Sequence, residues 1–153
     1  MNYKTIIENI DKLISSNMNT YGIIFLRYSI GIIFIWFGIL KPFGISPAQD
    51  LVANTVYWFE NKLAFVKFLG WWEVLIGLTM CYKPLIRLSI LLLFIQMPGT
   101  FLPLILLPDI CFTDFPFGLT LEGQYIIKNL IIISSGLVIG GTVRKSPTPK
   151  PMA

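Results

Sequence analysis

The stretch FLGWWEVLIGLTM, residues 68–80, decides the fold, because it is apolar except for one carboxylate, that of Glu73. These side chains suit the hydrocarbon interior of a bilayer, where a carboxylate is costly unless it has a partner. The fold must therefore supply a cation or a hydrogen-bond donor to Glu73 within the membrane.

The composition of the whole chain is that of a membrane protein. Of its 153 residues, 55% are hydrophobic and 13% are charged, and the mean hydropathy is +0.73. A soluble domain carries about 25% charged residues. The basic residues stand at the ends of apolar runs, so membrane orientation explains the sequence pI near 9.1 and a nucleic-acid partner is disfavoured.

Metal and cofactor chemistry lacks its usual ligands in this sequence. There is no histidine, and there are two cysteines, Cys81 and Cys111. Zinc, haem and iron–sulfur sites need several such ligands grouped together. We therefore expect no metal, no cofactor and no independent redox catalysis. A signal peptide is also disfavoured, because the first apolar run starts only at Tyr21 and is too long.

Four apolar segments are long enough to cross a hydrocarbon core of about 30 Å as helices. They cover residues 22–41, 65–82, 85–107 and 125–143, to within a few residues at each end. The sequence therefore predicts an all-α integral membrane fold, a four-transmembrane-helix bundle over residues 21–143.

Three further segments flank or connect these spans. Residues 1–20 have an apolar face of isoleucine and leucine, which predicts an amphipathic N-terminal surface helix; a plain lead-in to the first span is the alternative. In the first outer loop, Ser46 is the expected N-cap of an interfacial helix with Pro47 in its first turn. That helix would rest on the membrane or cover the bundle as a lid. Residues 144–153 form a basic, proline-rich tail.

The distribution of lysine and arginine predicts that both termini are cytoplasmic. Under this topology, seven basic residues lie on the side of the termini and three on the other side. Cytoplasmic segments carry such an excess. The topology places Cys81 and Cys111 on opposite sides of the membrane, which disfavours a disulfide between them, and it leaves Cys111 exposed in the second outer loop.

Each span carries one stripe of small or polar residues. On the second span, Gly70, Glu73 and Gly77 share a face, so Glu73 points into the bundle where helices approach closely. Depth along the helices then favours Lys128 as the partner of Glu73, with Lys41 as a second cation. The predicted buried polar site is Glu73, Lys128, Lys41 and Gln124; the secondary polar positions are Arg27, Gln96 and Ser135; the helix-packing glycines are Gly31, Gly38, Gly70 and Gly77.

Two structural alternatives remain open at this point. Pro98 and Gly99 predict a kink in the third span, which either lines a cavity or only bends the helix. A buried Glu–Lys pair either serves a function or simply fixes the register of the helices.

Five motifs in this order resemble the DoxX-like membrane protein family, and its YkgB branch most nearly. They are FLRYSIGIIFIWFGILK (25–41), LVANTVYW (51–58), GWWEVLIGL (70–78), MPGTF (97–101) and GQYIIKNLIII (123–133). The resemblance implies a four-helix protein of the bacterial inner membrane that supports resistance to oxidants or reactive chlorine. It would act as a subunit of, or partner to, a membrane redox assembly. The resemblance carries no catalytic residue.

Three functions follow from these observations. In the first, the buried Glu–Lys site of an oxidant-defence protein holds a partner protein, or a quinone-like or lipid ligand. In the second, Glu73 is the proton or cation site of a small transporter or channel. In the third, the chain is a structural membrane scaffold. The expected partners are the lipid bilayer, a membrane redox protein or a second copy of this chain.

Overall fold

The computed structural model describes residues 3–143, so the predicted tail over 144–153 lies outside the described residues. The chain is predominantly helical, and four of its helical segments are long and apolar enough to cross a membrane. These findings confirm the predicted helical chain with four candidate spans and indicate a multi-pass membrane protein. The helices concerned are α1 (Tyr3–Leu40), α3 (Lys62–Cys81), α4 (Ile86–Leu106) and the consecutive pair α6 (Leu121–Ile127) and α7 (Asn129–Gly141).

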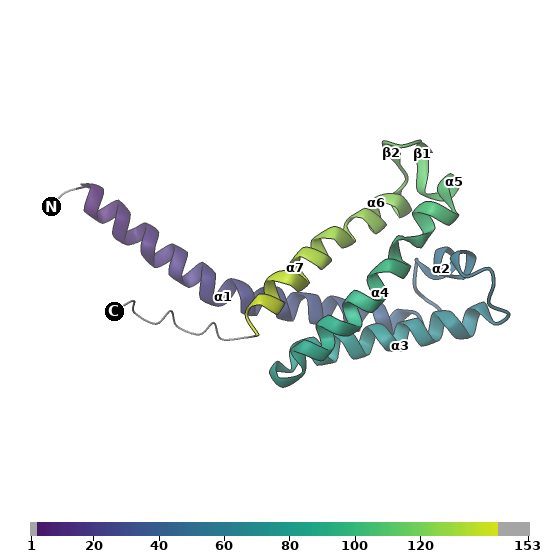
Figure 1. Ribbon diagram of the computed structural model, residues 1–153, viewed down its shortest axis with the longest axis horizontal. Coiled ribbons are helices and arrows are strands. Elements are labelled where there is room, and N and C mark those ends of the chain that lie inside the picture. Colours follow the sequence, from purple (N-terminus) through teal and green to yellow (C-terminus); the bar gives the residue numbers. More distant parts are fainter. Residues whose placement is uncertain (1–2, 144–153) are drawn as a thin grey trace, which may run out of the picture.

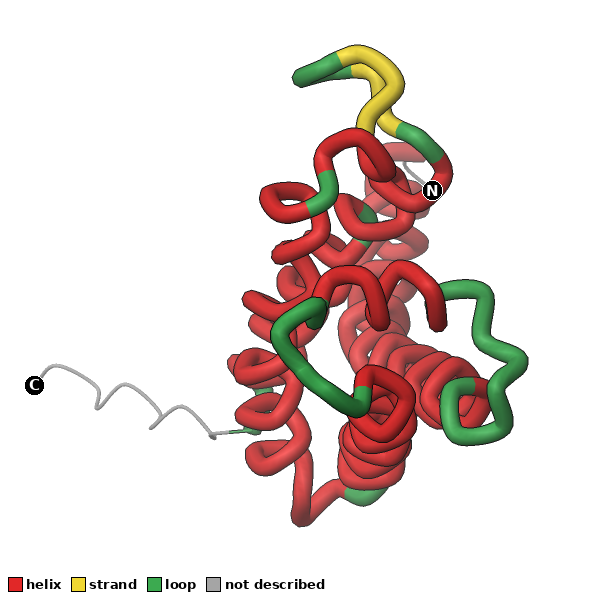
Figure 2. The backbone as a smooth tube through the Cα atoms, turned by 90° about the vertical axis from the view of Figure 1, so that its right-hand side faces the viewer, coloured by secondary structure: helices red, strands yellow, loops and turns green. Residues whose placement is uncertain are grey.

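The long helices pack side by side around a common apolar core (Figures 1 and 2). Helix α1 packs mainly against α3, α3 against α4, and α4 against α7, while α7 also contacts α1. All four spans therefore contribute to one bundle. The buried core consists of Ile30, Phe34, Ile76, Met80, Ile86, Leu92, Leu93, Met97 and Ile139.

Helix α1 continues without the predicted break after residue 20. It runs for 38 residues, which corresponds to a length of about 57 Å. No proline or glycine lies between Tyr3 and Tyr21 to end a helix there. The first half of α1 projects beyond the other helices (Figure 1), and its apolar side chains are exposed. The predicted surface helix and the first span are thus a single continuous helix.

Helices α1 and α3 approach most closely at four glycines. A Cβ atom on Gly38 would lie 2.8 Å from the carbonyl oxygen of Gly70, and a Cβ on Gly77 would lie 2.5 Å from that of Gly31. Only glycine fits at this distance, since real Cβ atoms do not approach a backbone oxygen so closely. All four glycines are buried. Their contact holds the end of α1 against the middle of α3.

The helix in the loop after α1, α2 (Gln49–Thr55), begins three residues later than its predicted cap. The N-cap is Ala48 without a side-chain hydrogen bond, so the prediction of Ser46 as N-cap is wrong. The backbone carbonyl of Ser46 instead accepts a hydrogen bond from Gln49 N–H at 3.1 Å in the preceding turn. Helix α2 packs against α3 and α4 with Thr55 buried. Helix α2 therefore packs on the bundle.

The loop between α4 and α6, the predicted second outer loop, is more ordered than expected and buries its cysteine. It contains the short helix α5 (Pro108–Cys111) and the antiparallel strands β1 (Phe112–Asp114) and β2 (Gly118–Leu119). Cys111 is fully buried, so its predicted exposure is wrong. The reason is local folding: Thr120 N–H donates to the Cys111 carbonyl at 3.1 Å, and Gly123 packs against the same carbonyl. Burial, followed by the charge of Glu122, raises the pKa of the Cys111 thiol.

The third and fourth spans differ in their continuity. Helix α4, which follows a short 3-10 turn (η1, Lys83–Leu85), stays helical through Pro98 and Pro103. Neither proline therefore ends the helix. The fourth span is divided at Lys128, where α6 ends and α7 begins.

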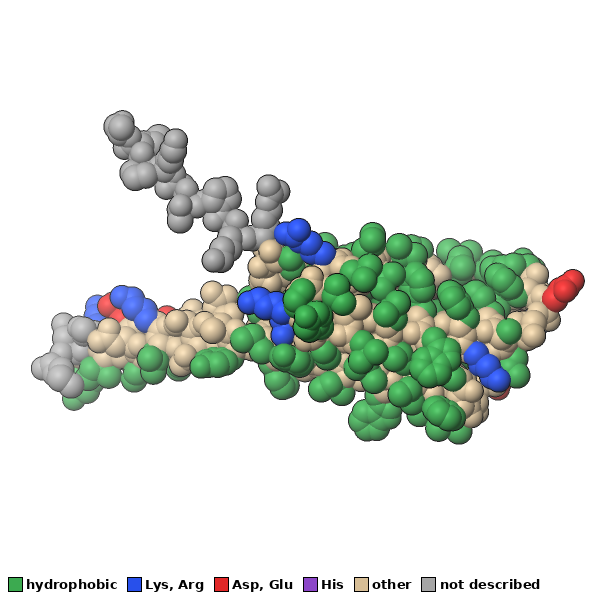
Figure 3. Space-filling view, turned by 90° about the horizontal axis from the view of Figure 1, so that it is seen from below, with side chains coloured by type: hydrophobic (Ala, Val, Ile, Leu, Met, Phe, Trp, Pro, Cys, Tyr) green, Lys and Arg blue, Asp and Glu red, His purple; other side chains and the backbone are tan. Residues whose placement is uncertain are grey.

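The exterior of the bundle is largely apolar (Figure 3), and one of its ends is basic. Apolar side chains cover most of the face shown in Figure 3, as expected of a surface in contact with lipid. We call the end at which α3 leads into α4 the basic end. Since Gly31 of α1 lies against Gly77 and Cys81 of α3, Arg27 of α1 lies near this end. The cations of the basic end are Arg27, Lys83 and Arg87, and the segments 21–35, 78–90 and 136–143 that meet there contain no acidic residue.

Candidate functional site

The carboxylate of Glu73 contacts two polar side chains from two other helices. The ammonium group of Lys41, just after the end of α1, forms a salt bridge with Glu73 Oε2. The side-chain amide of Gln96, on α4, donates a hydrogen bond from Nε2 to Glu73 Oε1 at 2.9 Å. We call Lys41, Glu73 and Gln96 the Glu73 cluster. Each oxygen of the carboxylate therefore has its own donor.

The two charges of the cluster are removed from solvent. The side chain of Lys41 is 7% exposed and that of Glu73 is 12% exposed. Burial makes the attraction between the charges stronger, but it also removes the hydration of both groups. Such a pair adds little net stability, whereas loss of one partner leaves a buried charge that is strongly destabilising. The two residues are therefore strongly dependent on each other.

The backbone around the four glycines positions the lysine. Lys41 follows Gly38 by three residues, and its N–H donates to the Gly38 carbonyl at 3.2 Å. The Cβ atom of Lys41 would lie 2.8 Å from a Cβ built on Gly70. Gly70 stands three residues before Glu73 and therefore on the same face of α3. The glycine contact thus delivers the ammonium group to the carboxylate.

Gln96 retains an unused hydrogen-bond acceptor. Its Oε1 atom is buried and accepts no hydrogen bond from any residue in the described part of the chain. Buried polar atoms usually have a partner, and an exception calls for an explanation. The free acceptor belongs to the same amide group whose nitrogen binds Glu73. A small molecule with a hydroxyl or N–H group would satisfy it.

Two predicted members of the buried site lie elsewhere. The side chain of Lys128 is exposed, so the structure pairs Glu73 with Lys41 instead of Lys128. Gln124 is also exposed, and its Nε2 donates to the Leu119 carbonyl at 3.3 Å. The reason is the packing of the fourth span: α7 packs mainly on α4 and α1, and α6 mainly on α5 and α4, rather than on α3. The position of a residue along its helix predicts its depth in the membrane, but it does not predict which helix lies beside it.

The secondary polar positions have separate environments. Gln96 joins the Glu73 cluster as a direct ligand of the carboxylate. Ser135 is buried and donates to the Ile131 carbonyl one turn earlier at 2.7 Å. The guanidinium of Arg27 lies 4.7 Å from the centre of the Tyr28 ring, and its Nε is buried without a partner among residues 3–143. Only Gln96 therefore belongs to the site.

An aromatic cleft at the connection between α2 and α3 is the feature that sequence reasoning missed. It has a volume of about 630 Å³ and is lined by Trp58, Phe59, Phe65 and Phe68 together with Glu60, Asn61 and Ala64. In the sequence, the aromatic residues on either side of Asn61 could have indicated this cleft. Asn61 itself caps α3, since its side chain accepts a hydrogen bond from Ala64 N–H at 3.0 Å.

The described residues contain no group of three or more histidine, cysteine, aspartate or glutamate side chains that could hold a metal ion. The expectation about metals concerns the whole chain and stays a prediction.

Fold and site together define a small multi-pass membrane protein with a buried ion pair at the contact of three spans. No family model matches this chain, and no curated protein and no solved structure is found to be similar to it. The resemblance to DoxX-like proteins therefore rests on the motifs in the sequence.

Proposed function

We propose that this protein supports the resistance of a bacterial inner membrane to oxidants, reactive chlorine among them, as a small partner of a membrane redox assembly. The observation that carries the proposal is the Glu73 cluster, in which a compensated carboxylate lies beside the free acceptor Gln96 Oε1. The order of the five sequence motifs supports the choice of oxidant defence.

The chemistry of the cluster favours a ligand that donates a hydrogen bond. Lys41 Nζ and Gln96 Nε2 each donate to Glu73, and the atom of the cluster that has no partner among the described residues is the acceptor Gln96 Oε1. A quinone carbonyl, which only accepts hydrogen bonds, would leave that acceptor unpaired. A quinol hydroxyl or the hydroxyl of a lipid would instead donate to Gln96 Oε1. We therefore propose the reduced, hydroxyl-bearing form of a quinone-like molecule, or a lipid hydroxyl, as the ligand.

A structural scaffold is the second candidate function, and one observation favours it. The three residues of the cluster come from the turn just after α1, from α3 and from α4, so the cluster connects three spans. An ion pair of this kind fixes the register of packed helices without any ligand. A transporter that uses Glu73 remains the third function and would lose transport when the carboxylate is removed.

Survival of cells under hypochlorite tests the proposal. Cells lacking the protein would be complemented with the wild type, with Gln96→Leu, or with Lys128→Gln as an exposed control outside the cluster. We expect the wild type and Lys128→Gln to restore survival and Gln96→Leu to fail at equal membrane level. Absence of a phenotype in the deletion strain would refute oxidant defence.

A pair of compensating substitutions separates function from scaffolding. Lys41→Met combined with Glu73→Leu removes both charges and fills the space with apolar side chains of similar size. A scaffold tolerates this exchange, because neutral packing replaces a buried pair at little cost. A ligand site does not tolerate it. Restored stability with lost protection supports the proposed function; restored stability with restored protection supports the scaffold.

A further inference from the structure

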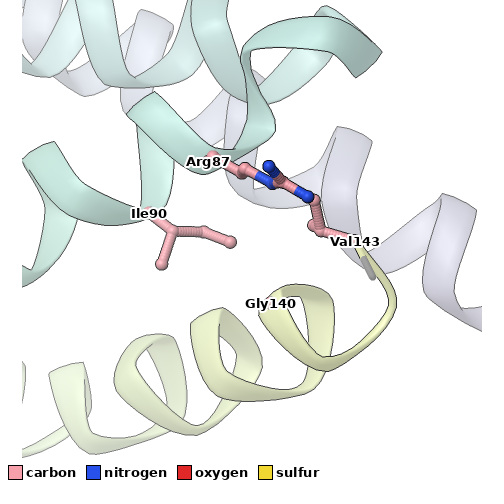
Figure 4. A pocket seen from close by; sticks show the side chains of 4 residues that line it. All are labelled: Arg87, Ile90, Gly140 and Val143. Carbon is pink, nitrogen blue, oxygen red and sulfur yellow. The ribbon is translucent and has the colours of Figure 1, made fainter. Parts of the chain in front are cut away.

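A cleft at the basic end of the bundle lies between α4 and α7, away from the Glu73 cluster. It has a volume of about 540 Å³ and is lined by Arg87, Ile90, Gly140 and Val143. Figure 4 shows the Arg87 side chain extending from α4 toward Val143, with Ile90 pointing toward the turn of α7 that contains Gly140. The cleft is therefore apolar on its walls and carries one cation.

The absence of a side chain at Gly140 helps to keep this cleft open. A Cβ atom on Gly140 would lie 3.4 Å from Ile90 Cδ1, so the two walls are already in contact distance of one another there. A larger side chain at this position would occupy the space between the helices. At the next residue, Gly141, a Cβ would meet nothing within 4 Å. Gly140 therefore lines the cleft, whereas Gly141 does not.

The charge of Arg87 is not compensated by the described part of the protein. Its guanidinium forms no salt bridge with residues 3–143, and none of the helix segments that meet at the basic end contains an acidic residue. The segment 144–153, which follows Val143 in the sequence, contains no aspartate or glutamate either. An arginine in such surroundings favours an anion, and phosphate oxygens match the planar guanidinium well.

We propose that this cleft binds one anionic phospholipid, with its phosphate on Arg87 and the first part of an acyl chain against Ile90, Gly140 and Val143. The proposal depends on the membrane-spanning character of the bundle and not on the proposed function. A cation above an apolar cleft at the end of a span matches the two parts of a phospholipid, and basic pockets between spans bind anionic headgroups. The volume lies within the range of ligand pockets, about 300–1,000 Å³.

Lipid binding to the purified full chain tests this assignment. The protein in neutral detergent would be titrated with phosphatidylglycerol or with phosphatidylcholine of the same acyl chains, and bound lipid would be counted by native mass spectrometry. We expect phosphatidylglycerol to bind about fivefold more tightly than phosphatidylcholine, the difference that one basic residue near a membrane surface provides.

Two matched pairs of variants locate the bound lipid. Arg87→Gln should reduce the affinity for phosphatidylglycerol to that for phosphatidylcholine, whereas Lys83→Gln, a cation of the same end outside the cleft, should leave it unchanged. Gly140→Leu should weaken both lipids and Gly141→Leu neither. The thermal stability of every variant is measured alongside, and Arg87→Lys serves as a second variant that keeps the charge and retains part of the preference.

Three outcomes would overturn the assignment. Equal losses in Arg87→Gln and Lys83→Gln would show general attraction to a basic surface. Unchanged binding in a folded Gly140→Leu would place the lipid outside this cleft. Displacement of phosphatidylglycerol by glycerol 3-phosphate at a similar concentration would identify a site for a soluble anion, because that competitor has the phosphate but no acyl chain.

Discussion

We predict that replacing Lys41 and replacing Glu73, the two partners of the buried salt bridge, lower the free energy of unfolding by different amounts. Both side chains are almost completely buried, at 7% and 12% exposed. Removing one partner of a buried pair costs about 3–5 kcal/mol, because the other charge stays buried without compensation. The cost depends on whether the remaining charge can reach water.

The positions of the two residues in the fold decide this difference. Glu73 follows the first residue of α3 by eleven positions, so it lies about 16 Å along a helix of about 30 Å and cannot reach either end. Lys41 stands just beyond α1, and its flexible chain can extend to the interface. We therefore expect Lys41→Met to lower the free energy of unfolding by the full amount of about 3–5 kcal/mol, and Glu73→Leu to lower it by roughly 1–2 kcal/mol.

Thermal unfolding in one detergent, followed by size-exclusion chromatography after heating, measures the order of these effects. The expected order of stability is wild type close to Lys41→Met/Glu73→Leu, then Glu73→Leu, then Lys41→Met. Lys128→Gln serves as the control, since its charge is exposed and lies outside the cluster. A double variant no more stable than Lys41→Met would refute mutual compensation, and equal single losses would refute the argument from position.

Three further predictions concern packing and the outer loop. Gly38→Leu should prevent the close contact of α1 with α3 and cost several kcal/mol, since its Cβ would lie 2.8 Å from backbone atoms; Gly22→Leu, with nothing within 4 Å, should change the melting temperature little. Gly123→Ala should loosen the Cys111 carbonyl contact and expose the thiol, which labelling with iodoacetamide in the native state would detect. Because the pKa of Cys111 is raised by folding, the folded thiol stays protonated at a pH at which the unfolded thiol ionises. The stability that this group contributes is therefore present below the unfolded pKa and falls as the pH rises above it. A series of melting temperatures from pH 7 to about 10, compared with Cys111→Ala, measures that loss.

The sequence was sufficient for the large elements of the fold because hydropathy and helix length are local properties. Four apolar runs of adequate length predicted four candidate spans, and the structure contains them. The shared face of Gly70, Glu73 and Gly77 predicted that the carboxylate points toward a neighbouring helix, and α1 is that neighbour. Three- and four-residue spacing on one helix requires no knowledge of the rest of the chain.

The partner of Glu73 could not be derived in the same way. Lys41 and Lys128 both lie near the expected height, and the choice between them depends on which helix stands beside α3. That neighbour is set by the close contact at Gly38 and Gly70, a property of two helices together. The burial of Cys111 has a similar origin, because it results from a contact with Gly123 across the loop.

Gln96 is the residue at which structural and functional explanations of the cluster separate. A purely structural cluster needs a donor for Glu73 Oε1, and Gln96 Nε2 supplies it at 2.9 Å. A structural cluster gains nothing from the buried, unpaired oxygen Gln96 Oε1, since such an atom lowers stability by about 1–3 kcal/mol. A ligand that donates a hydrogen bond to this oxygen would remove that cost. A scaffold predicts instead that Lys41→Met/Glu73→Leu/Gln96→Met, in which apolar side chains replace the whole cluster, keeps both stability and oxidant resistance.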